Sequence, residues 1–210
     1  MFLIFAFLIY LLSKKHDLGY QKADVLIQAG HEGRTSGYTG AQSRYGKEVD
    51  WNRDVANEVT RILKEAGVSV IRVGAKMPIS RVKIAVAIHF DGSVHPCRSG
   101  ASIGYGSLSH KRLADAWKRT YARYYPFDWM EDNFTSNLSR YYGYKYVFSQ
   151  KGFLVLELGE LTCKKEALWL RYRLKKIARL MAYFIAKELG VEGVGRPVGA
   201  NKQKDEGFLF

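Results

Sequence analysis

Two histidines and two glutamates in this chain are residues from which a catalytic zinc site can be built. They are His31, Glu48, His89 and Glu157. Two imidazoles and one carboxylate are a known ligand set for catalytic zinc, which keeps a fourth position open for water. A second carboxylate that does not bind the metal can then move protons as a general base. The four residues are spread over more than a hundred positions, so the fold would have to bring them together.

The segments that carry these residues predict alternating strands and helices. Short apolar runs predict strands, and apolar residues three or four positions apart predict helices. We expect strands at residues 25–29, 68–73, 81–89 and 153–159, and helices at residues 47–66, 108–124 and 164–189. Residues 92–106 are rich in Gly and Ser, as loops are, and residues 125–146 are aromatic and polar without a clear period. This order predicts an α/β protein with a single open, mostly parallel, twisted sheet and helices on both faces.

A parallel sheet would gather the candidate residues at one edge. His31, His89 and Glu157 each stand at or near the end of an apolar run that predicts a strand, and the carboxyl ends of parallel strands lie at the same edge. Glu48 opens the helix after the first strand, and a right-handed crossover directs the start of that helix to the same edge. We therefore expect the four side chains to converge.

Each of the four also has an ordinary structural explanation. A histidine after a strand is commonly a loop or capping residue, which would account for His31. A glutamate in the first turn of a helix interacts favourably with the helix dipole, which would account for Glu48. His89 follows a core strand and needs a polar partner. Glu157 is the hardest to explain alone, because an apolar run does not bury a carboxylate without compensation.

The order and spacing of four segments resemble the zinc-dependent N-acetylmuramoyl-L-alanine amidases of the Amidase_3 type. Members of that family have a strand ending in Gly-His, a Glu that opens a helix with an Asn four residues on, a strand ending in Ile-His, and a strand ending in Glu-x-Gly. Here the segments are "VLIQAGHEG", "GKEVDWN", "AVAIH" and "VLELGELT". The resemblance covers about residues 24–189, and it rests on the four motifs together.

The resemblance implies roles for the four residues. His31, Glu48 and His89 match the zinc (Zn2+) ligands, and Glu157 matches the catalytic glutamate. The implied reaction is hydrolysis of the amide that joins N-acetylmuramic acid to L-alanine in peptidoglycan, for wall lysis or remodelling. One departure is Glu32, which replaces the glycine that usually follows Gly-His and is a rival ligand or base. A compact basic domain of this kind is as typical of a phage or prophage lysin as of a housekeeping enzyme.

The aromatic run at residues 134–148 is a candidate substrate platform. Aromatic rings suit the faces of sugars, and the cations of Arg140 and Lys145 suit the carboxylates of a stem peptide. We take Arg140 and Tyr144 as candidate substrate-binding residues. The alternative is that these tyrosines only pack against the edge of the sheet.

The charge balance indicates an anionic partner. Lys and Arg number 33 and Asp and Glu number 20, which gives a net charge of +13 and favours binding to polyanions. Two alternatives to the amidase stay open: a zinc hydrolase of another acidic polymer, such as poly-γ-glutamate or stem-peptide bonds, and a non-enzymatic nucleic-acid-binding module. The chain has no nucleic-acid-binding motif, so we expect no nucleic acid as a partner. We expect peptidoglycan as the substrate and a monomeric protein.

Three regions are expected along the chain: an apolar N-terminal segment and linker at residues 1–23, the catalytic domain at 24–190, and a flexible tail at 191–210. Residues 1–12 are apolar but shorter than the roughly 20 residues that span a bilayer. They could be cleaved, packed, or an anchor that adds membrane contact to the basic surface. We expect the protein at the bacterial envelope or periplasm, or, as a phage lysin, released from the host cytoplasm.

The two cysteines, Cys97 and Cys163, do not have metal-site spacing. We expect two free, buried thiols, with a disulfide between them as the alternative.

Overall fold

The computed structural model describes residues 19–197. The apolar segment at residues 1–12 and most of the predicted tail lie outside this range. Within the described range, no helix is long and apolar enough to cross a membrane.

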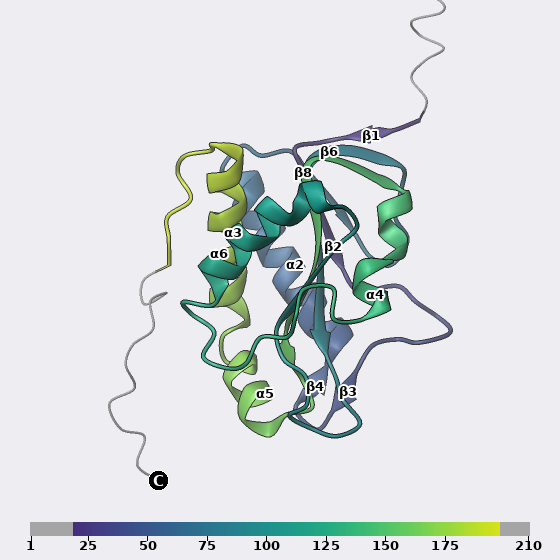
Figure 1. Ribbon diagram of the computed structural model, residues 1–210. Helices are drawn as coiled ribbons and strands as arrows, with labels where there is room; N and C mark the ends of the chain where they lie inside the picture. Colours follow the sequence, from purple (N-terminus) through teal and green to yellow (C-terminus); the bar gives the residue numbers. More distant parts are fainter. Residues whose placement is uncertain (1–18, 198–210) are drawn as a thin grey trace, which may run out of the picture.

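A six-stranded sheet forms the centre of the molecule (Figure 1). Its strands are β1 (Gln21–Lys22), β2 (Val25–Ala29), β5 (Val70–Val73), β6 (Ser80–Asp91), β7 (Ser102–Tyr105) and β8 (Val147–Glu160). The order is β5-β2-β6-β8-β7, with β1 paired to the start of β6. All pairs are parallel except β7 with β8. A separate two-stranded ribbon joins β3 (Gln42–Ser43) to β4 (Gly46–Lys47).

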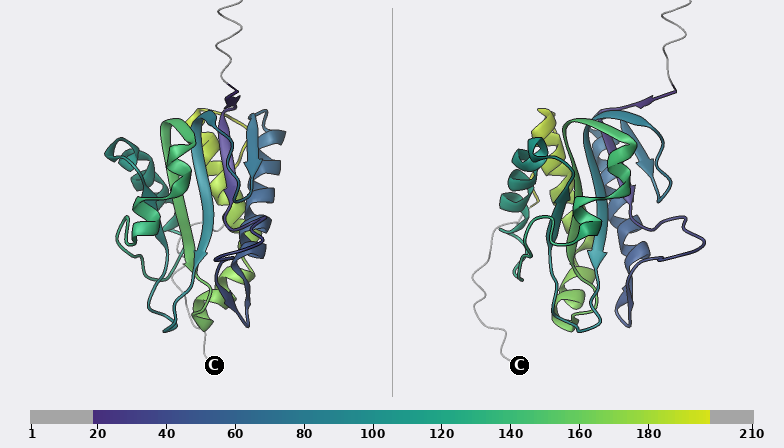
Figure 2. Two further views of the ribbon diagram at one scale, coloured as in Figure 1. Left: turned by 90° about the vertical axis from the view of Figure 1, so that its right-hand side faces the viewer. Right: turned by 45° about the vertical axis from the view of Figure 1, so that its right-hand side comes forward.

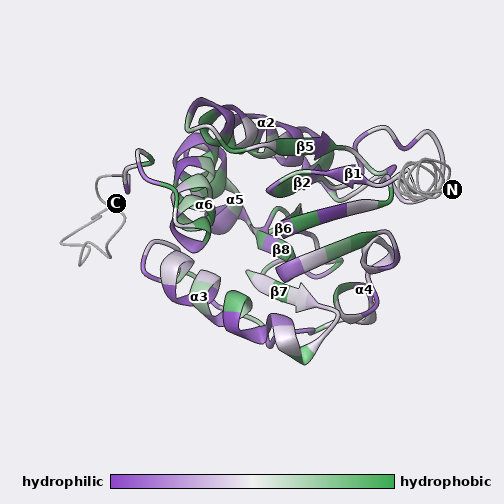
Figure 3. Cartoon of the chain, turned by 90° about the horizontal axis from the view of Figure 1, so that it is seen from above, coloured by the Kyte–Doolittle hydropathy of each residue, from purple (hydrophilic) through white to green (hydrophobic). Residues whose placement is uncertain are grey.

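The longer helices cover one face of the sheet, and short helical turns cover the other (Figure 3). The first group is α2 (Glu48–Glu65), α3 (Lys111–Tyr121), α5 (Lys164–Arg171) and α6 (Leu174–Leu189). The second group is α4 (Ser136–Ser139) and the 3-10 turn η2 (Tyr142–Lys145); a further 3-10 turn, η1 (Leu108–His110), precedes α3. The predicted α/β class and open, mostly parallel sheet are therefore confirmed, although the helices are distributed unequally.

Burial on both faces explains why β2 and β6 read as continuous apolar runs. Successive residues of a strand point to opposite faces, so Val25 and Ile27 pack under the long helices, whereas Leu26 packs under the short turns. Gln28 is the polar exception, and it is fully buried on the second face. Its presence there needs hydrogen-bond partners, which lie at the site described below.

The single helix expected at residues 164–189 is wrong, because the segment forms two helices, α5 and α6. The chain turns at Tyr172 and Arg173, where the Arg173 N–H donates to the carbonyl of Leu170. The guanidinium of Arg173 lies over the ring of Trp169 at 4.9 Å. Leu170 and Ile177 are both in the core, so the apolar spacing continues across the turn and conceals it in the sequence.

Strand β7 lies in the segment 92–106, for which no regular structure was expected. Its residues are buried, and a side chain at Gly104 would overlap Leu138 of α4. Glycine is therefore required by close packing, whereas in the sequence it indicated a loop. Strand β8 is also longer than predicted, because its first residues pair with the start of β6.

The expectation of free thiols is wrong, because Cys97 and Cys163 form a disulfide. It joins the loop after β6 to the residue before α5, across 66 positions of the sequence. The same loop is held by Glu160, whose carboxylate accepts hydrogen bonds from the N–H groups of Cys97 and Ser99. The disulfide therefore fastens a loop that leads away from the carboxyl end of β6.

Candidate metal centre

Three of the candidate residues meet at the carboxyl edge of the sheet, in the wall of a cavity of about 610 Å³. His31 follows β2, His89 lies near the end of β6, and Glu48 is the first residue of α2. All three side chains are buried, and one ligand atom from each lies within 4.8 Å of the others. Among residues 19–197 this is the group of histidines and carboxylates that could hold a metal ion.

The carboxylate of Glu48 is the centre of the group. Its Oε1 lies 2.9 Å from Nδ1 of His89 and 3.2 Å from Nε2 of His31. Its Oε2 accepts a hydrogen bond of 2.7 Å from the N–H of Ala41. Burial favours the neutral acid, but the two histidines beside the carboxylate outweigh burial and hold the pKa of Glu48 well below its ordinary value. The carboxylate is therefore ionised and faces both imidazoles.

The other nitrogen of His31 faces a backbone carbonyl. Nδ1 lies 3.3 Å from the carbonyl oxygen of Tyr38, which also accepts a hydrogen bond from Arg34 at 2.8 Å. A carbonyl oxygen only accepts, so the contact with Tyr38 favours a proton on Nδ1 of His31, whereas the guanidinium of Arg34, 3.4 Å from the same nitrogen, favours the other tautomer. In the tautomer with the proton on Nδ1, the lone pair of Nε2 is directed to the centre of the group.

The other nitrogen of His89 is fixed by a longer chain of hydrogen bonds. The amide nitrogen of Gln28 donates to the carbonyl of Gly74, so the amide oxygen of Gln28 faces Tyr141 and accepts its hydroxyl proton at 2.6 Å. The hydroxyl of Tyr141 has thus used its proton, and Nε2 of His89, at 3.2 Å, must donate to it. Nδ1 of His89 is left as the nitrogen that faces Glu48.

Two glycines leave room for this packing. A side chain at Gly30 would overlap the imidazole of His89, and Gly30 is followed by His31 in a left-handed conformation with φ of 63°. Gly40, with φ of 101°, approaches the carboxylate of Glu48 and the ring of His31. The amide of Asn52 donates to the carbonyl of Gly30 and to Glu48. The Gly-His segment therefore serves to bring the two imidazoles against each other.

The donor set fits a zinc ion. Two imidazole nitrogens and one ionised carboxylate oxygen point to one place, and the outer nitrogen of each imidazole faces a hydrogen-bond acceptor. Outer partners of this kind are a regular feature of histidines that bind metals. Two imidazoles with one carboxylate are also a ligand set of catalytic zinc.

Glu157 lies beside the group on the neighbouring strand. It is the register partner of His89 across β6 and β8, it lines the cavity, and its Oε2 is buried without a hydrogen-bond partner in the described part of the chain. Burial, together with the negative charges of Glu48 and Asp91, raises the pKa of Glu157 well above its ordinary value. A bound cation would oppose this rise. The carboxyl group is thus held in the cavity without a structural partner.

The remaining sequence candidates take different places. Arg140 lines the cavity and is exposed. Tyr144 does not line it: its hydroxyl donates to the carbonyl of Leu138, and its ring packs on Phe153. Glu32, the rival ligand or base, forms an ion pair of 2.8 Å with Arg72 and does not belong to the group.

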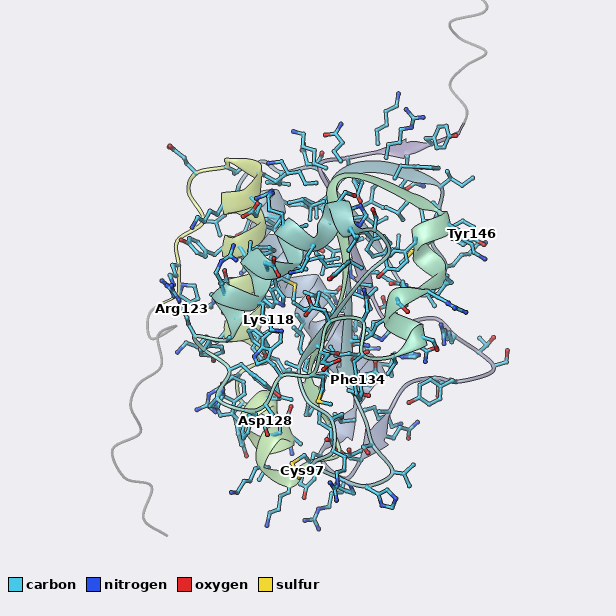
Figure 4. The ribbon with its side chains drawn as sticks, viewed as in Figure 1. Cys97, Lys118, Arg123, Asp128, Phe134 and Tyr146 are labelled. Carbon is cyan, nitrogen blue, oxygen red and sulfur yellow. A yellow bond between two sulfur atoms is a disulfide. The ribbon has the colours of Figure 1, made fainter. Side chains whose placement is uncertain are left out.

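Gln28 and Arg34 were not anticipated as residues of the site. Phe134, Tyr141 and Tyr142 belong to the aromatic run at residues 134–148, which was expected as a substrate platform, and all three line the cavity. Gln28 and Tyr141 orient His89, and Arg34 and Tyr142 line the cavity, with the guanidinium of Arg34 lying 5.9 Å from the ring of Tyr142. Phe134, labelled in Figure 4, lines the same cavity and is 46% exposed. Gln28 had a signal in the sequence, since it is a polar residue within an apolar run, as Glu157 is. Arg34 had no such signal, and the tyrosine-rich run did not distinguish Tyr141, which orients His89, from its neighbours.

Comparison with solved structures places the chain in a known fold. No family model matches the sequence, and no curated protein matches it. The catalytic domain of CwlV, an N-acetylmuramoyl-L-alanine amidase from Bacillus (Paenibacillus) polymyxa var. colistinus, aligns with a TM-score of 0.63 and 20% identity, over 82% of this chain and 99% of that one. The amidase AmiC2 of Nostoc punctiforme aligns with a TM-score of 0.59 and 19% identity, over 82% and 99%.

An endolysin is also among the similar structures. The catalytic domain of the CD27L endolysin, described as targeting Clostridia difficile, aligns with a TM-score of 0.58 and 12% identity, over 79% of this chain and 97% of that one. In each case nearly the whole of the other domain is covered. The chain therefore has the fold of the N-acetylmuramoyl-L-alanine amidases, as the resemblance in the sequence predicted.

Proposed function

We propose that the protein is a zinc-dependent N-acetylmuramoyl-L-alanine amidase, which hydrolyses the amide between N-acetylmuramic acid and L-alanine in peptidoglycan. The observation that carries the proposal is the buried His31–Glu48–His89 group in a fold shared with amidases of this activity. The unpartnered carboxyl of Glu157 beside that group supports a catalytic role for the cavity. The substrate would place the protein at the bacterial envelope, either as a wall enzyme or as a phage lysin.

In this proposal His31, Glu48 and His89 hold the zinc ion. When bound, zinc supplies a Lewis acid that polarises the amide carbonyl and lowers the pKa of a water molecule. The protein's part is to present three deprotonated ligand atoms. Tyr38 and Tyr141 do this for the two imidazoles through their outer nitrogens, and Ala41 and Asn52 orient the carboxylate of Glu48.

Glu157 is the proposed general base. Glu157 lines the cavity and its Oε2 has no hydrogen-bond partner in the described part of the chain, so its carboxylate would take a proton from the attacking water and deliver it to the leaving amine nitrogen. No other side chain competes for that oxygen among residues 19–197. A carboxylate with a structural role accepts hydrogen bonds from donors of the protein. A general base instead needs an oxygen that is free to bind the attacking water.

The cavity walls suit a substrate that carries both sugar and peptide. Arg34 and Arg140 offer two cations, and Phe134 and Tyr142 offer aromatic rings. We propose that Arg140 binds a carboxylate of the stem peptide, since no structural ion pair of its side chain is seen in the described part of the chain. Tyr144 would contribute only indirectly, through its contact with Leu138 next to α4.

Digestion of purified peptidoglycan by the zinc-loaded protein tests the function. Mass spectrometry of the soluble products should find stem peptides with a free N-terminal L-alanine, and a chelator should abolish them. Glu157→Gln should keep the bound metal and lower the rate by about 10²-fold or more, as expected for a general base. Glu32→Gln is the matched control, because Glu32 directly follows His31 but pairs with Arg72 outside the metal group, and it should leave the rate unchanged.

Three results would overturn parts of the proposal. Products cut elsewhere in the stem, or from an acidic polymer such as poly-γ-glutamate, would keep the metal site and change the substrate. Loss of activity in Glu32→Gln with activity kept in Glu157→Gln would exchange the two roles. A purified protein that binds no zinc would remove the proposed chemistry altogether.

A further inference from the structure

Exposed apolar side chains gather at the amino-terminal ends of β6 and β8, far from the cavity along the strands. Ile79, Tyr146 and Phe148 are 50%, 41% and 54% exposed. The N–H of Ser80 donates to the carbonyl of Tyr146, which sets Ile79 beside Tyr146. Tyr20 packs its ring against Phe148, with the ring centres 6.1 Å apart. We name Tyr20, Ile79, Tyr146 and Phe148 the aromatic face; Tyr146 is labelled in Figure 4.

Cationic side chains border the aromatic face. Lys22, Arg81 and Phe148 stand in one row across β1, β6 and β8, so their side chains leave the sheet on the same side. The guanidinium of Arg81 lies over the ring of Tyr20 at 4.9 Å, and Lys145 is exposed next to Tyr146. Residues 76–83 and 142–151 include no aspartate or glutamate. The surface therefore combines aromatic rings with positive charge.

The chain outside the described range joins the molecule at this surface. Residues 1–18 lead to Gly19, which directly precedes Tyr20 of the aromatic face. Residues 1–12 of that part are apolar in sequence. The eight residues from Leu12 to Tyr20 span at most about 28 Å when extended. Any surface that receives the apolar segment is therefore within reach of the aromatic face.

We propose that the aromatic face rests on an anionic lipid bilayer, with the apolar segment at residues 1–12 as a second attachment. Aromatic rings favour the interface between lipid and water, and each Lys or Arg near an anionic membrane adds to the attraction. Attachment at a bilayer surface becomes stable when two such signals act together. The face offers one signal and the apolar segment offers the other.

This placement would direct the cavity away from the lipid. The aromatic face lies at the amino ends of β6 and β8, and His89 lies nine residues further along β6, or about 30 Å at the rise of a strand. Figure 2 shows these strands running side by side from the end near β1 to the opposite end. That the cavity would then face the cell wall rests on the proposed function. The membrane contact itself does not depend on that function.

Vesicle binding by the full-length chain tests the proposal. Wild type should sediment with vesicles of phosphatidylcholine and phosphatidylglycerol, bind pure phosphatidylcholine vesicles more weakly, and lose affinity for the anionic vesicles as salt rises. Tyr146→Glu with Phe148→Glu should lower the partition coefficient about tenfold or more. The matched control is Leu108→Glu with Tyr172→Glu, which changes two side chains that are 82% and 77% exposed elsewhere. It should stay within about twofold of wild type.

A second pair of variants removes charge without adding it, in case the first does not fold. Arg81→Gln with Lys145→Gln should weaken binding to anionic vesicles several-fold and leave binding to neutral vesicles unchanged. Arg171→Gln with Lys175→Gln, two cations on the helical side, is its control and should have less effect. Circular dichroism and the melting temperature check the fold of every variant.

Several outcomes would overturn the proposal. Equal binding by wild type and both face variants would assign all attachment to residues 1–12. Equal losses of vesicle affinity in the face variants and the control variants would show that only net charge matters. Absence of vesicle binding by the wild type would contradict the proposal directly. Binding to a soluble polyanion such as dextran sulfate, without binding to vesicles, would identify an anionic polymer instead. Amide hydrolysis of a soluble substrate, measured in parallel, separates each result from a failure of the proposed function.

Discussion

At the scale of single residues, the orientation of His89 depends on two neutral side chains that a search for metal ligands overlooks. The hydroxyl of Tyr141 accepts a hydrogen bond from Nε2 of His89, and it donates its own hydrogen bond to the amide oxygen of Gln28. Tyr141→Phe removes the acceptor, so His89 can take the tautomer that protonates Nδ1. We expect a 10- to 100-fold loss of zinc affinity, about the effect of losing such an outer partner. Competition with a fluorescent chelator measures it.

Tyr144→Phe is the matched control for that experiment. Tyr144 is in the same segment, and its hydroxyl also donates one hydrogen bond, but to the carbonyl of Leu138. It should lose stability without losing zinc affinity. Nitrogen chemical shifts of His89 report the tautomer independently of the metal. Equal zinc affinities for both variants, or an unchanged tautomer in Tyr141→Phe, would show that the hydroxyl of Tyr141 has no part in the site.

The sequence was informative about residues wherever the backbone alone positions them. The convergence of His31, His89 and Glu157 is predictable because each stands at or near the carboxyl end of a strand, and parallel strands share that edge. Tyr141 reaches the same place from a segment without period, and its position depends on packing against β2 and β8. Side chains positioned by tertiary packing of this kind carry no signal in spacing.

At the scale of elements, the strands were predictable and the turns were less so. β2 and β6 are buried on both faces, and strands of this kind consist of consecutive apolar residues that are recognisable in the sequence. The break between α5 and α6 keeps Leu170 and Ile177 in the core, so the helical period passes through it unchanged. β7 was concealed by Gly104, which is glycine because α4 packs against it. The spacing of apolar residues indicates which side chains are buried. It indicates a turn of the chain only where the turn changes that spacing.

The attachment of α5 to the sheet should depend on pH. Burial raises the pKa of Glu166 to about 7 from an ordinary value of 4.5, against hydrogen bonds from Tyr125 and from the N–H of Glu160, which lower it. Between these values the folded protein keeps a proton that the unfolded chain releases. This contribution to the free energy of unfolding is complete below about pH 4.5 and is lost as pH rises through about 7; it amounts to about 3 kcal/mol at most.

Urea unfolding of wild type and Glu166→Gln from pH 4.5 to pH 8 measures that contribution. Glutamine is neutral throughout and keeps an oxygen that accepts from Tyr125 and Glu160. The free energy of unfolding of wild type should therefore fall relative to the variant as pH rises across this range. Parallel curves for the two proteins would mean that the carboxyl of Glu166 titrates alike in the folded and unfolded states.

At the scale of the whole molecule, the net charge of +13 should act on the substrate as a polymer and leave the chemistry of the bond untouched. Intact peptidoglycan with its attached anionic polymers attracts a basic protein over the Debye length, which falls from about 10 Å at about 0.1 M salt to about 3 Å at about 1 M. Hydrolysis of intact walls should therefore slow several-fold over this range. A small soluble fragment with the same amide should be cut at nearly constant rate, because its contacts lie within the cavity. If salt slowed both substrates equally, the ions would be acting on Arg34, Arg140 or the metal ligands, and the basic surface would have no role in reaching the wall.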